Sequence, residues 1–233
     1  MCFLIWAVGL FSDAPEPVPK TSDVAQNVVR IGVLKLPAVL VKGVTFEMGS
    51  DDESSPEDTR PAHTVTLTDF YISVTEVTVG QYKEYCRQTG KSMPEQEAGT
   101  SDSYPIAFVT WYEANEFCQW VGGYLPTEAQ WEYAARSGGL DLKYPNGNTI
   151  DHSLANYSGI GQTDKWKRIA PVAKFPPNSL GLYDMAGNVS EWTADLYSEQ
   201  GYRTLRGGAW YDGGDFVRCA WRDHVNPDYW LNY

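Results

Sequence analysis

The C-terminal stretch from Leu205 to Tyr233 constrains this chain more than any other part of its sequence. From Trp210 onward the stretch holds seven aromatic residues and four aspartates, with no lysine, glutamate, glutamine or methionine. Its apolar residues follow neither the period of 2 of a strand nor the period of 3.6 of a helix. Rings and small polar residues on irregular backbone are typical of a binding surface, because rigid rings supply contact area at low entropic cost. An aromatic, loop-rich core segment is the alternative, since aromatic residues dominate cores as well as interfaces.

The overall composition narrows the classes of partner. The 233 residues are 42% hydrophobic, so the chain can bury a sizeable core as one large domain or two small ones. A net charge of −12 argues against nucleic acid and anionic lipid as partners, because both are bound by clustered Lys and Arg. The four cysteines do not have metal-ligand spacing. Cys86 and Cys118 fall in predicted helices, where buried thiols are expected and one disulfide is the alternative.

The first 20 residues differ from the rest of the chain. The apolar run from Cys2 to Phe11 is ten residues long, too short to cross a bilayer as a helix, and no basic region precedes it. Residues 13–20 are Pro-rich and charged, as expected of an extended linker. Two interpretations stay open: a signal fragment or mis-called start with Cys2 as a lipid-attachment site, or a short segment that docks on the domain or is disordered. We expect the folded domain to span residues 21–233.

Three helices are predicted from the same N-terminal signature. Thr78, Thr110 and Thr127 are each followed three residues later by Gln or Glu, which is the pattern of a capping box. Apolar residues with helical spacing follow each threonine, and glycines end the helices near residues 90, 122 and 138. β-Branched runs over 28–33 and 36–46 predict short strands, and the alternation over 63–74 predicts a strand pair. Beyond Leu140 we find no helical period, and residues 141–204 are turn-rich. With 21 Gly, 14 Pro and 14% aromatic residues, the composition favours a loop-rich α+β domain over a helix bundle.

Oxygen-bearing side chains in the irregular part of the chain are the candidate metal ligands. Asn156, Asp164, Asn188 and Glu191 lie in segments where carboxylates, amides and backbone carbonyls can surround Ca²⁺. None has EF-hand spacing. From the residues alone, turns and hydrogen bonds that organise long loops are the simpler explanation.

Six motifs, in order along the chain, resemble the formylglycine-generating-enzyme (sulfatase-modifying factor) superfamily. They are FEMGS at 46–50, RPAHTVTLTDFYISVTEVTVGQYKEYC at 60–86, PIAFVTWYEANEFCQW at 105–120, YLPTEAQWEYAARSGG at 124–139, FPPNSLGLYDMAGNVSEWTADLY at 175–197 and RGGAWYD at 206–212. The resemblance implies a C-type lectin fold of the formylglycine-generating-enzyme type, with a small twisted antiparallel sheet, two main helices and much irregular loop. This agrees with the α+β pattern of few strands, capped helices and long turns.

The resemblance also implies a copper-dependent oxidation of a substrate cysteine, but the residues depart from it there. The family's enzymes bind copper with two cysteines shortly after the RGG motif. Asp212 stands at the position similar to the first cysteine, and the stretch 213–217 has none for the second. A lone thiolate cannot supply a two-sulfur copper site. We therefore predict no catalytic residues and no required cofactor; a copper oxidase and a catalytically inactive structural member are the alternatives.

The resemblance raises the case for calcium. The family's calcium positions are similar to Asn156 and Asp164 at one site, and to Asn188 and Glu191 at a second. The sugar-binding triplets of vertebrate C-type lectins are absent, which disfavours calcium-dependent lectin activity.

A non-enzymatic branch of the superfamily fits better: the variable proteins of diversity-generating retroelements, whose treponemal members are surface lipoproteins. In this branch, replacement of adenines in codons such as AAC diversifies a C-terminal binding face and never introduces Lys, Glu, Gln or Met. The C-terminal stretch obeys that restriction, although Trp221 and Trp230 would need another template codon or be fixed. Family chains continue into a closing strand, so we expect residues to be missing after Tyr233.

The resemblance implies a protein-binding surface on a cell-surface or extracellular protein, with an unknown protein ligand, no nucleic acid, and membrane attachment only through Cys2. The residues expected on this surface are Tyr211, Asp212, Gly213, Asp215, Phe216, Val217, Trp221, Asp223, His224, Val225, Tyr229, Trp230, Leu231, Asn232 and Tyr233.

Overall fold

The computed structural model describes residues 5–7, 16–17, 28–159 and 165–229. Its largest sheet is antiparallel, with the strand order β1-β7-β4-β3-β2. The strands are β1 (Ile5–Ala7), β2 (Glu16–Pro17), β3 (Val28–Ile31), β4 (Leu36–Val41) and β7 (Phe70–Ser73). Of the two interpretations of the N-terminus, the pairing of β1 with β7 and of β2 with β3 supports docking on the domain. Cys2 lies outside the described residues.

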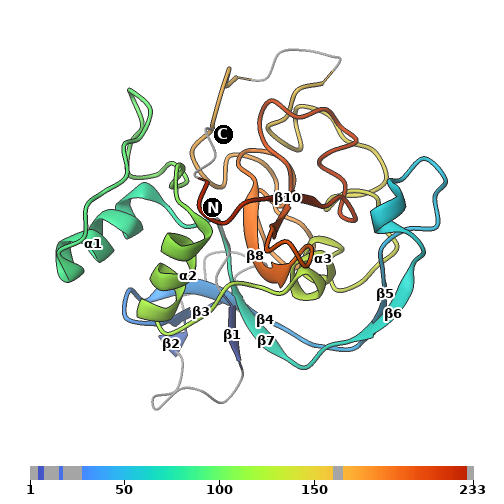
Figure 1. Ribbon diagram of the computed structural model, residues 1–233, viewed down its shortest axis with the longest axis horizontal. Helices are drawn as coiled ribbons and strands as arrows, with labels where there is room; N and C mark the ends of the chain where they lie inside the picture. The colour runs from blue at the N-terminus through green and yellow to red at the C-terminus, as the bar shows by residue number, and fades with distance from the viewer. Residues whose placement is uncertain (1–4, 8–15, 18–27, 160–164, 230–233) are drawn as a thin grey trace.

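A long hairpin extends from this sheet. β5 (Thr45–Met48) pairs with β6 (His63–Thr66), and a 3-10 turn at Glu57–Thr59 lies between them. Figure 1 shows β4 continuing into β5 and β6 into β7 along one curved ribbon. Gly43 lies between β4 and β5, where a Cβ would be 2.3 Å from the carbonyl oxygen of Leu67, so only glycine permits this close approach. The strand pair expected over 63–74 is present as two strands, but they pair with β5 and β4 rather than with each other.

All three predicted helices are present: α1 (Val79–Thr89), α2 (Trp111–Trp120) and α3 (Glu128–Ala135). Each begins at the expected threonine with a complete capping box, in which the threonine hydroxyl and the N3 side chain bond backbone N–H groups reciprocally. Helix α1 ends at Gly90, which adopts the left-handed conformation. Among the described residues, none of the helices has the length and apolar character needed to cross a bilayer.

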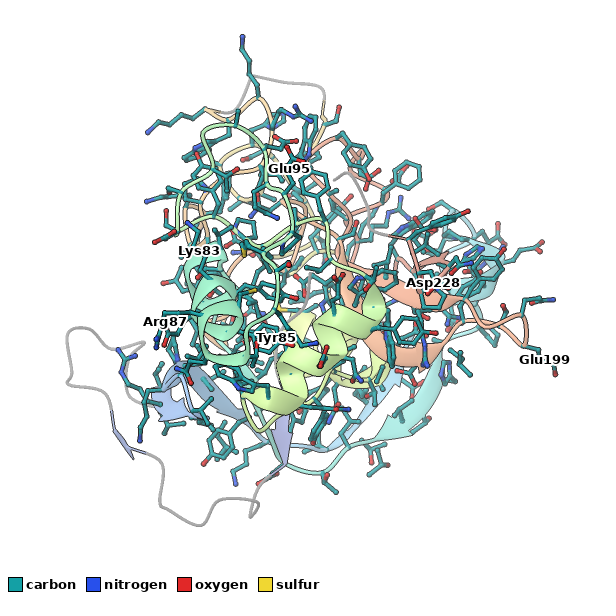
Figure 2. The ribbon with its side chains drawn as sticks, turned by 60° about the vertical axis from the view of Figure 1, so that its left-hand side comes forward. Lys83, Tyr85, Arg87, Glu95, Glu199 and Asp228 are labelled. Carbon is teal, nitrogen blue, oxygen red and sulfur yellow. The ribbon has the colours of Figure 1, made fainter. Side chains whose placement is uncertain are left out.

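The core has two main parts. One part lies between α1, α2 and the neighbouring strands. There Tyr85 of α1 packs against the rings of Phe117 and Trp120 of α2. Figure 2 shows Tyr85 between the two helices. The other surrounds Trp131 of α3, which is fully buried. The predicted α+β class is confirmed.

A third sheet forms from the end of the turn-rich region and the C-terminal stretch, where the sequence predicted no strand. It has the order β10-β9-β8 and consists of β8 (Glu191–Leu196), β9 (Arg203–Arg206) and β10 (Asp223–Val225). Strand β8 contacts both α2 and α3, and Figure 1 shows this sheet near the centre of the molecule. The described part of the C-terminal stretch, residues 205–229, is called here the C-terminal segment. It enters through β9 and leaves through β10, so both of its ends are tied to the core.

Candidate functional site

Arg206 anchors the C-terminal segment from below. Its buried guanidinium donates to Glu132 of α3 at 2.5 Å and to the carbonyl oxygens of residues 219–221 at 2.8–3.1 Å. A buried charge costs several kcal/mol of folding free energy unless it is paired. The hydrogen bonds to Glu132 and to the three carbonyl oxygens supply that pairing. One side chain therefore holds three consecutive residues of irregular backbone in place.

A second anchor joins the segment to the start of α3. Arg222 donates through Nε and Nη2 to the two carboxylate oxygens of Glu128, at 3.0 and 2.5 Å. The same carboxylate accepts a hydrogen bond from the buried hydroxyl of Thr204 in β9 at 2.9 Å. Paired Arg–carboxylate bonds of this kind restrict orientation as well as distance. Trp221 and Asp223, on either side of Arg222, are positioned by it.

Asn188 is the third anchor. Its carbonyl Oδ1 accepts from the backbone N–H of Ala170 at 2.8 Å and from Nδ2 of Asn156 at 3.1 Å, and its own Nδ2 donates to Glu76 at 3.1 Å. Its backbone carbonyl accepts from the N–H of Trp210 at 3.0 Å. Asn188 is buried in the left-handed conformation, which asparagine tolerates better than most residues. The network connects loops far apart in sequence to the base of the C-terminal segment.

The turn after the RGG motif depends on a glycine and an aspartate. Gly208 has φ +67°, and a Cβ there would lie 2.7 Å from the carbonyl oxygen of Phe216. Asp212 closes the turn, because its Oδ2 accepts from the N–H of Ala209 at 2.9 Å and its backbone carbonyl accepts from Ser158 at 2.8 Å. Asp212 thus has a structural role that its sequence position alone did not indicate.

Most of the residues expected on the binding surface are accessible. Tyr211, Phe216 and Tyr229 expose 37%, 43% and 63% of their surface. The expected residues that are exposed or half-buried beside them are Asp212, Gly213, Asp215, Trp221, Asp223, His224 and Val225. The assignment of Val217 to the surface is wrong: it is fully buried and packs in a small cluster with Tyr157. Trp230, Leu231, Asn232 and Tyr233 lie outside the described residues.

A small pocket opens among these side chains. It measures about 220 Å³, and the residues that line it are Ser190, Leu205, Gly208, Asp212, Phe216, Trp221 and Asp223. The rings of Phe216 and Trp221 meet nearly at right angles, with centroids 4.6 Å apart. Burial raises the pKa of Asp212, and the negative charge of Asp223 raises it further. We call this cavity the acidic pocket.

Aromatic side chains outside the C-terminal segment extend the surface. The imidazole of His224 stacks on Tyr197 with ring centroids 4.0 Å apart and meets the edge of Tyr202 at 5.4 Å. Next to them, the guanidinium of Arg203 lies 3.8 Å from the ring centroid of Trp111. Sequence reasoning missed these residues, because only the pairing of β10 with β9 brings His224 beside the β8–β9 hairpin.

Three of the four cysteines lie in the described part of the chain. Cys86, Cys118 and Cys219 are buried and form no disulfide, so the bridge left open between Cys86 and Cys118 is not present. None of the described cysteines lines the pocket. Burial raises the pKa of Cys219 to about 12, which keeps it a thiol at neutral pH. The position similar to the family's first cysteine, Asp212, does line the pocket.

The candidate calcium residues occupy a buried polar region. Asn156 and Asn188 share one hydrogen-bonded network rather than two sites, and both atoms of the Asn188 amide bond to protein groups. Glu191 is buried and accepts from the indole N–H of Trp131 at 2.8 Å. Asp164 lies outside the described residues, and the described ones contain no cluster of three or more His, Cys, Asp or Glu that could share a metal ion. In this geometry the two asparagines act as hydrogen-bonding residues, and calcium stays a prediction.

The same region carries buried negative charge. Glu76 is fully buried, and burial raises its pKa well above the ordinary value; the charges of Asp184 and Glu191 raise it further. Burial also raises the pKa of Asp184 to about 6. Glu76 accepts the hydrogen bond of Asn188, so this group of carboxyls lies next to the third anchor of the C-terminal segment.

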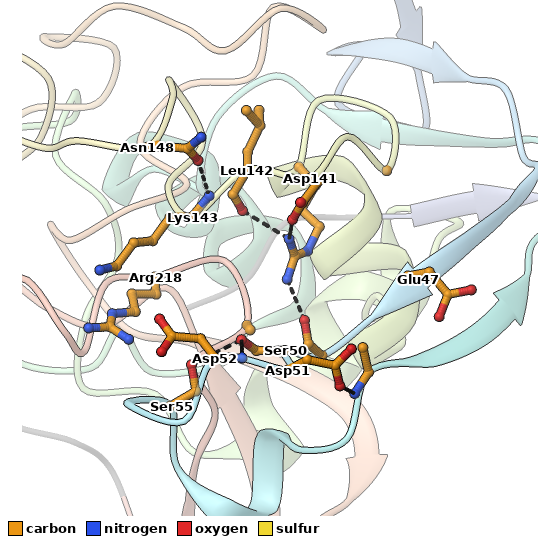
Figure 3. Close-up of a pocket in the computed structure, with 15 residues that line it drawn as sticks. Glu47, Ser50, Asp51, Asp52, Ser55, Asp141, Leu142, Lys143, Asn148 and Arg218 are labelled. Atoms are coloured by element: carbon orange, nitrogen blue, oxygen red, sulfur yellow. Dashed lines mark hydrogen bonds and ion pairs between the residues drawn. The ribbon is translucent and has the colours of Figure 1, made fainter.

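A larger cavity of about 580 Å³ lies beside the β5–β6 hairpin (Figure 3). Its charged groups are engaged with each other and with nearby backbone. Arg136 donates to the carbonyl oxygens of Gly49 and Leu142 at 2.6 and 2.9 Å, and Asp51 accepts from the N–H of Ala62 at 3.0 Å. These bonds explain the charged lining as part of the loop structure.

Known proteins resemble this chain in sequence and in fold. The family model of the sulfatase-modifying factor enzyme 1-like domain matches residues 34–232. "Serine/threonine-protein kinase Pkn1" of Chlamydia trachomatis serovar L2 is 34% identical over 92% of this chain and 40% of its own length. "Inactive C-alpha-formylglycine-generating enzyme 2" of Bos taurus is 29% identical over 76% of this chain and 77% of its own length. The chain spans only about two fifths of the length of the kinase.

Among solved structures, Treponema denticola variable protein 1 superimposes with a TM-score of 0.68 and 24% identity, over 88% of this chain and 95% of that one. This likeness concerns the fold. The family match covers most of the chain and includes the capped helices, the third sheet and the RGG turn described above. The chain therefore belongs to the sulfatase-modifying factor enzyme 1-like domain family.

Proposed function

We propose that this protein binds a protein ligand, without catalysing a reaction, through the exposed side chains of its C-terminal segment. The observation that carries the proposal is the combination of exposed aromatics with an anchored backbone. Tyr211, Phe216 and Tyr229 are accessible, while Arg206 and Arg222 hold the backbone between them. Rigid aromatic side chains around a pocket are typical of binding hot spots, because little conformational entropy is lost on association.

Three observations support the absence of catalysis. Asp212 replaces a cysteine at the position that the enzymes of the family use, and the nearby Cys219 is a buried thiol. A relative matched over 77% of its own length carries the word "inactive" in its name. The kinase resemblance does not extend to kinase chemistry, since the sequence has neither an H-R-D nor a D-F-G motif, which position the base and the magnesium ion in protein kinases.

The composition of the segment and the likeness to the treponemal variable protein support a further part of the proposal: the exposed residues are the diversified positions of a retroelement-encoded variable protein. Attachment to a cell surface through Cys2 belongs to the same proposal. A near-copy of the coding segment for residues 205–233, differing at adenines and adjacent to a reverse transcriptase gene, is the expected genomic observation.

Site-specific photo-crosslinking tests the binding surface. Benzoylphenylalanine is placed at Tyr229 or, as a matched control, at Val33 in the β3–β4 turn, since both residues are 63% exposed. Surface-protein extracts of cells that the organism contacts are then irradiated with each protein. We expect protein adducts at position 229 that disappear when Tyr211 and Phe216 are replaced by alanine. Equal adducts from positions 229 and 33 would contradict the proposal.

Catalysis is tested separately with a sulfatase-motif peptide, copper and oxygen. We expect the peptide cysteine to remain unmodified in mass spectra, and the protein to retain no stoichiometric copper. Clear conversion to formylglycine would show that the protein is an oxidase.

A further inference from the structure

We propose that the acidic pocket receives a cationic side chain of the ligand, a lysine ammonium or an arginine guanidinium, between Asp212 and Asp223. This inference rests on the proposed binding function and names the chemistry of the group that the site recognises.

The lining of the pocket is acidic and contains no basic residue. Two of its seven residues are aspartates, and none of the described residues lining it is lysine or arginine. The two arginines nearest in sequence are already paired: Arg222 binds both oxygens of Glu128, and Arg218 is ion-paired with Asp215. Outside the lining, Nδ1 of His224 lies 3.9 Å from Oδ1 of Asp223, and it balances that charge only when the imidazole is protonated. A cation from the ligand can therefore supply a counter-charge for Asp212 and Asp223.

The geometry is prepared for such a group. Asp212 is half-buried, and its Oδ2 is held by the N–H of Ala209 at 2.9 Å, so this carboxylate needs no reorganisation on binding. The perpendicular rings of Phe216 and Trp221 form the apolar wall. Aromatic faces attract ammonium and guanidinium groups and also cover the methylene stem of such a side chain.

The size of the pocket and its donor set narrow the ligand further. At about 220 Å³ it is smaller than the pockets of about 300–1,000 Å³ that enclose drug-sized molecules, so one side chain fits better than a whole small molecule. Two carboxylates are too few for a protein-bound metal ion of the calcium type, which takes six to eight oxygen ligands. An organic cation satisfies the same charges with the aromatic wall as its remaining contact surface.

Proton NMR with small probes tests the inference. The probes are Nα-acetyl-lysine N-methylamide, the corresponding arginine compound and, as the neutral match, Nα-acetyl-norleucine N-methylamide. The reporter is the indole N–H signal of Trp221, assigned with the Trp221→Phe variant. We expect saturable shifts with the lysine and arginine probes, weakened by added salt, and at least about fivefold weaker binding of the norleucine probe.

Isosteric variants localise the effect. Asp223→Asn and Asp212→Asn should each weaken binding of the lysine probe about fivefold or more, because each removes one of the two charges. Asp223 has an exposed side chain, so its variant should fold normally even if Asp212→Asn disturbs the turn. Asp228→Asn is the matched control: Asp228 is exposed in the same segment and does not line the pocket, and Figure 2 shows it at the surface.

The outcomes separate the two proposals. Equal binding of the lysine and norleucine probes, or unchanged lysine binding in the Asp223→Asn variant, overturns the cationic specificity. If the cationic specificity is overturned but crosslinking from position 229 remains site-specific, the protein still binds a protein ligand, and the group that enters the pocket is not a cation. If the lysine probe binds as expected but no site-specific protein adduct forms, the pocket is cationic in its specificity and the protein-ligand function is the proposal that fails.

Discussion

Within the C-terminal segment, the positions that hold the structure and the positions that face solvent occupy separate blocks. Residues 206–209 and 217–220 are buried, whereas residues 211–216 and 223–229 are half-buried or exposed. The buried blocks bond to α3 and to Gly187, while the exposed blocks hold Asp212, Phe216 and Asp223 at the acidic pocket. The difference shows how a fold can keep one backbone while the residues on its surface change.

Replacement of core tryptophans should show the largest difference in stability between buried and exposed positions. Trp131 and Trp192 are 0% and 1% exposed, so truncation to alanine should cost about 3–5 kcal/mol of unfolding free energy each. Tyr211 and Tyr229 should tolerate alanine within about 0.5 kcal/mol. Trp111 should lie between the groups, because it is half-buried. Urea unfolding compares the variants directly; equal losses in the two groups would mean that the segment is core.

Loss of the Arg206 anchor should be nearly as severe. Arg206→Met leaves one Glu132 oxygen and three backbone carbonyls without their donor, and should cost about 3 kcal/mol or more. Arg203→Met is the control. That half-buried guanidinium lies on the ring of Trp111 and donates to one carbonyl oxygen, of Ala194 at 2.7 Å, so its loss should cost about 1–2 kcal/mol. Chemical denaturation measures both variants. Similar losses would show that Arg206 does not carry the segment.

Protonation of the buried carboxylate of Asp184 should change the free energy of unfolding by a smaller amount. Burial raises the pKa of Asp184 from 3.8 to about 6, so the ionised form is disfavoured in the folded protein. The free energy of unfolding is therefore highest below pH 3.8, where Asp184 is protonated in both states. It falls as the pH rises through about 6, where the folded protein must ionise this group. Asp184→Asn should therefore stabilise the protein by about 2–3 kcal/mol at pH 8, and the gain should vanish near pH 4.

Asparagine at position 184 can still accept the hydrogen bond from the N–H of Ala173, so the substitution isolates the charge. Asp228→Asn is the exposed control and should stay within about 0.5 kcal/mol of the wild type at both pH values. Unfolding curves at pH 4 and pH 8 provide the comparison. A gain for Asp184→Asn that does not change with pH would assign the effect to packing.

Calcium should have the smallest effect on stability of the changes considered, through the loops beneath the C-terminal segment. If an ion binds near Glu191 and the buried carboxylates, apparent stability should rise by about 1.4 kcal/mol for each tenfold excess of calcium over its dissociation constant. Glu191→Gln and Asp164→Asn should weaken the response, and magnesium should substitute poorly because it requires tighter octahedral geometry. Thermal melts in EDTA and then in calcium test this. An unchanged melting temperature would leave these residues with hydrogen-bonding roles alone.

The helices were predictable because their signals are local. A threonine and the residue three positions later meet within one turn, so the capping boxes at Thr78, Thr110 and Thr127 determine where α1, α2 and α3 begin. The strand β8 was not predictable in the same way. Its register with β9 shifts between Trp192 and Leu196, so the alternation that would indicate a strand is interrupted.

The candidate site divides along the same line. Sequence composition alone indicated that the C-terminal segment is unusual, and the family resemblance indicated the RGG motif near its start. Only tertiary structure separated Val217, buried beside Tyr157, from its exposed neighbour Phe216. Only tertiary structure brought Tyr197 and Tyr202 onto His224. Local signals depend on neighbours three or four residues away, whereas burial and pocket formation depend on contacts between segments that the chain order does not relate.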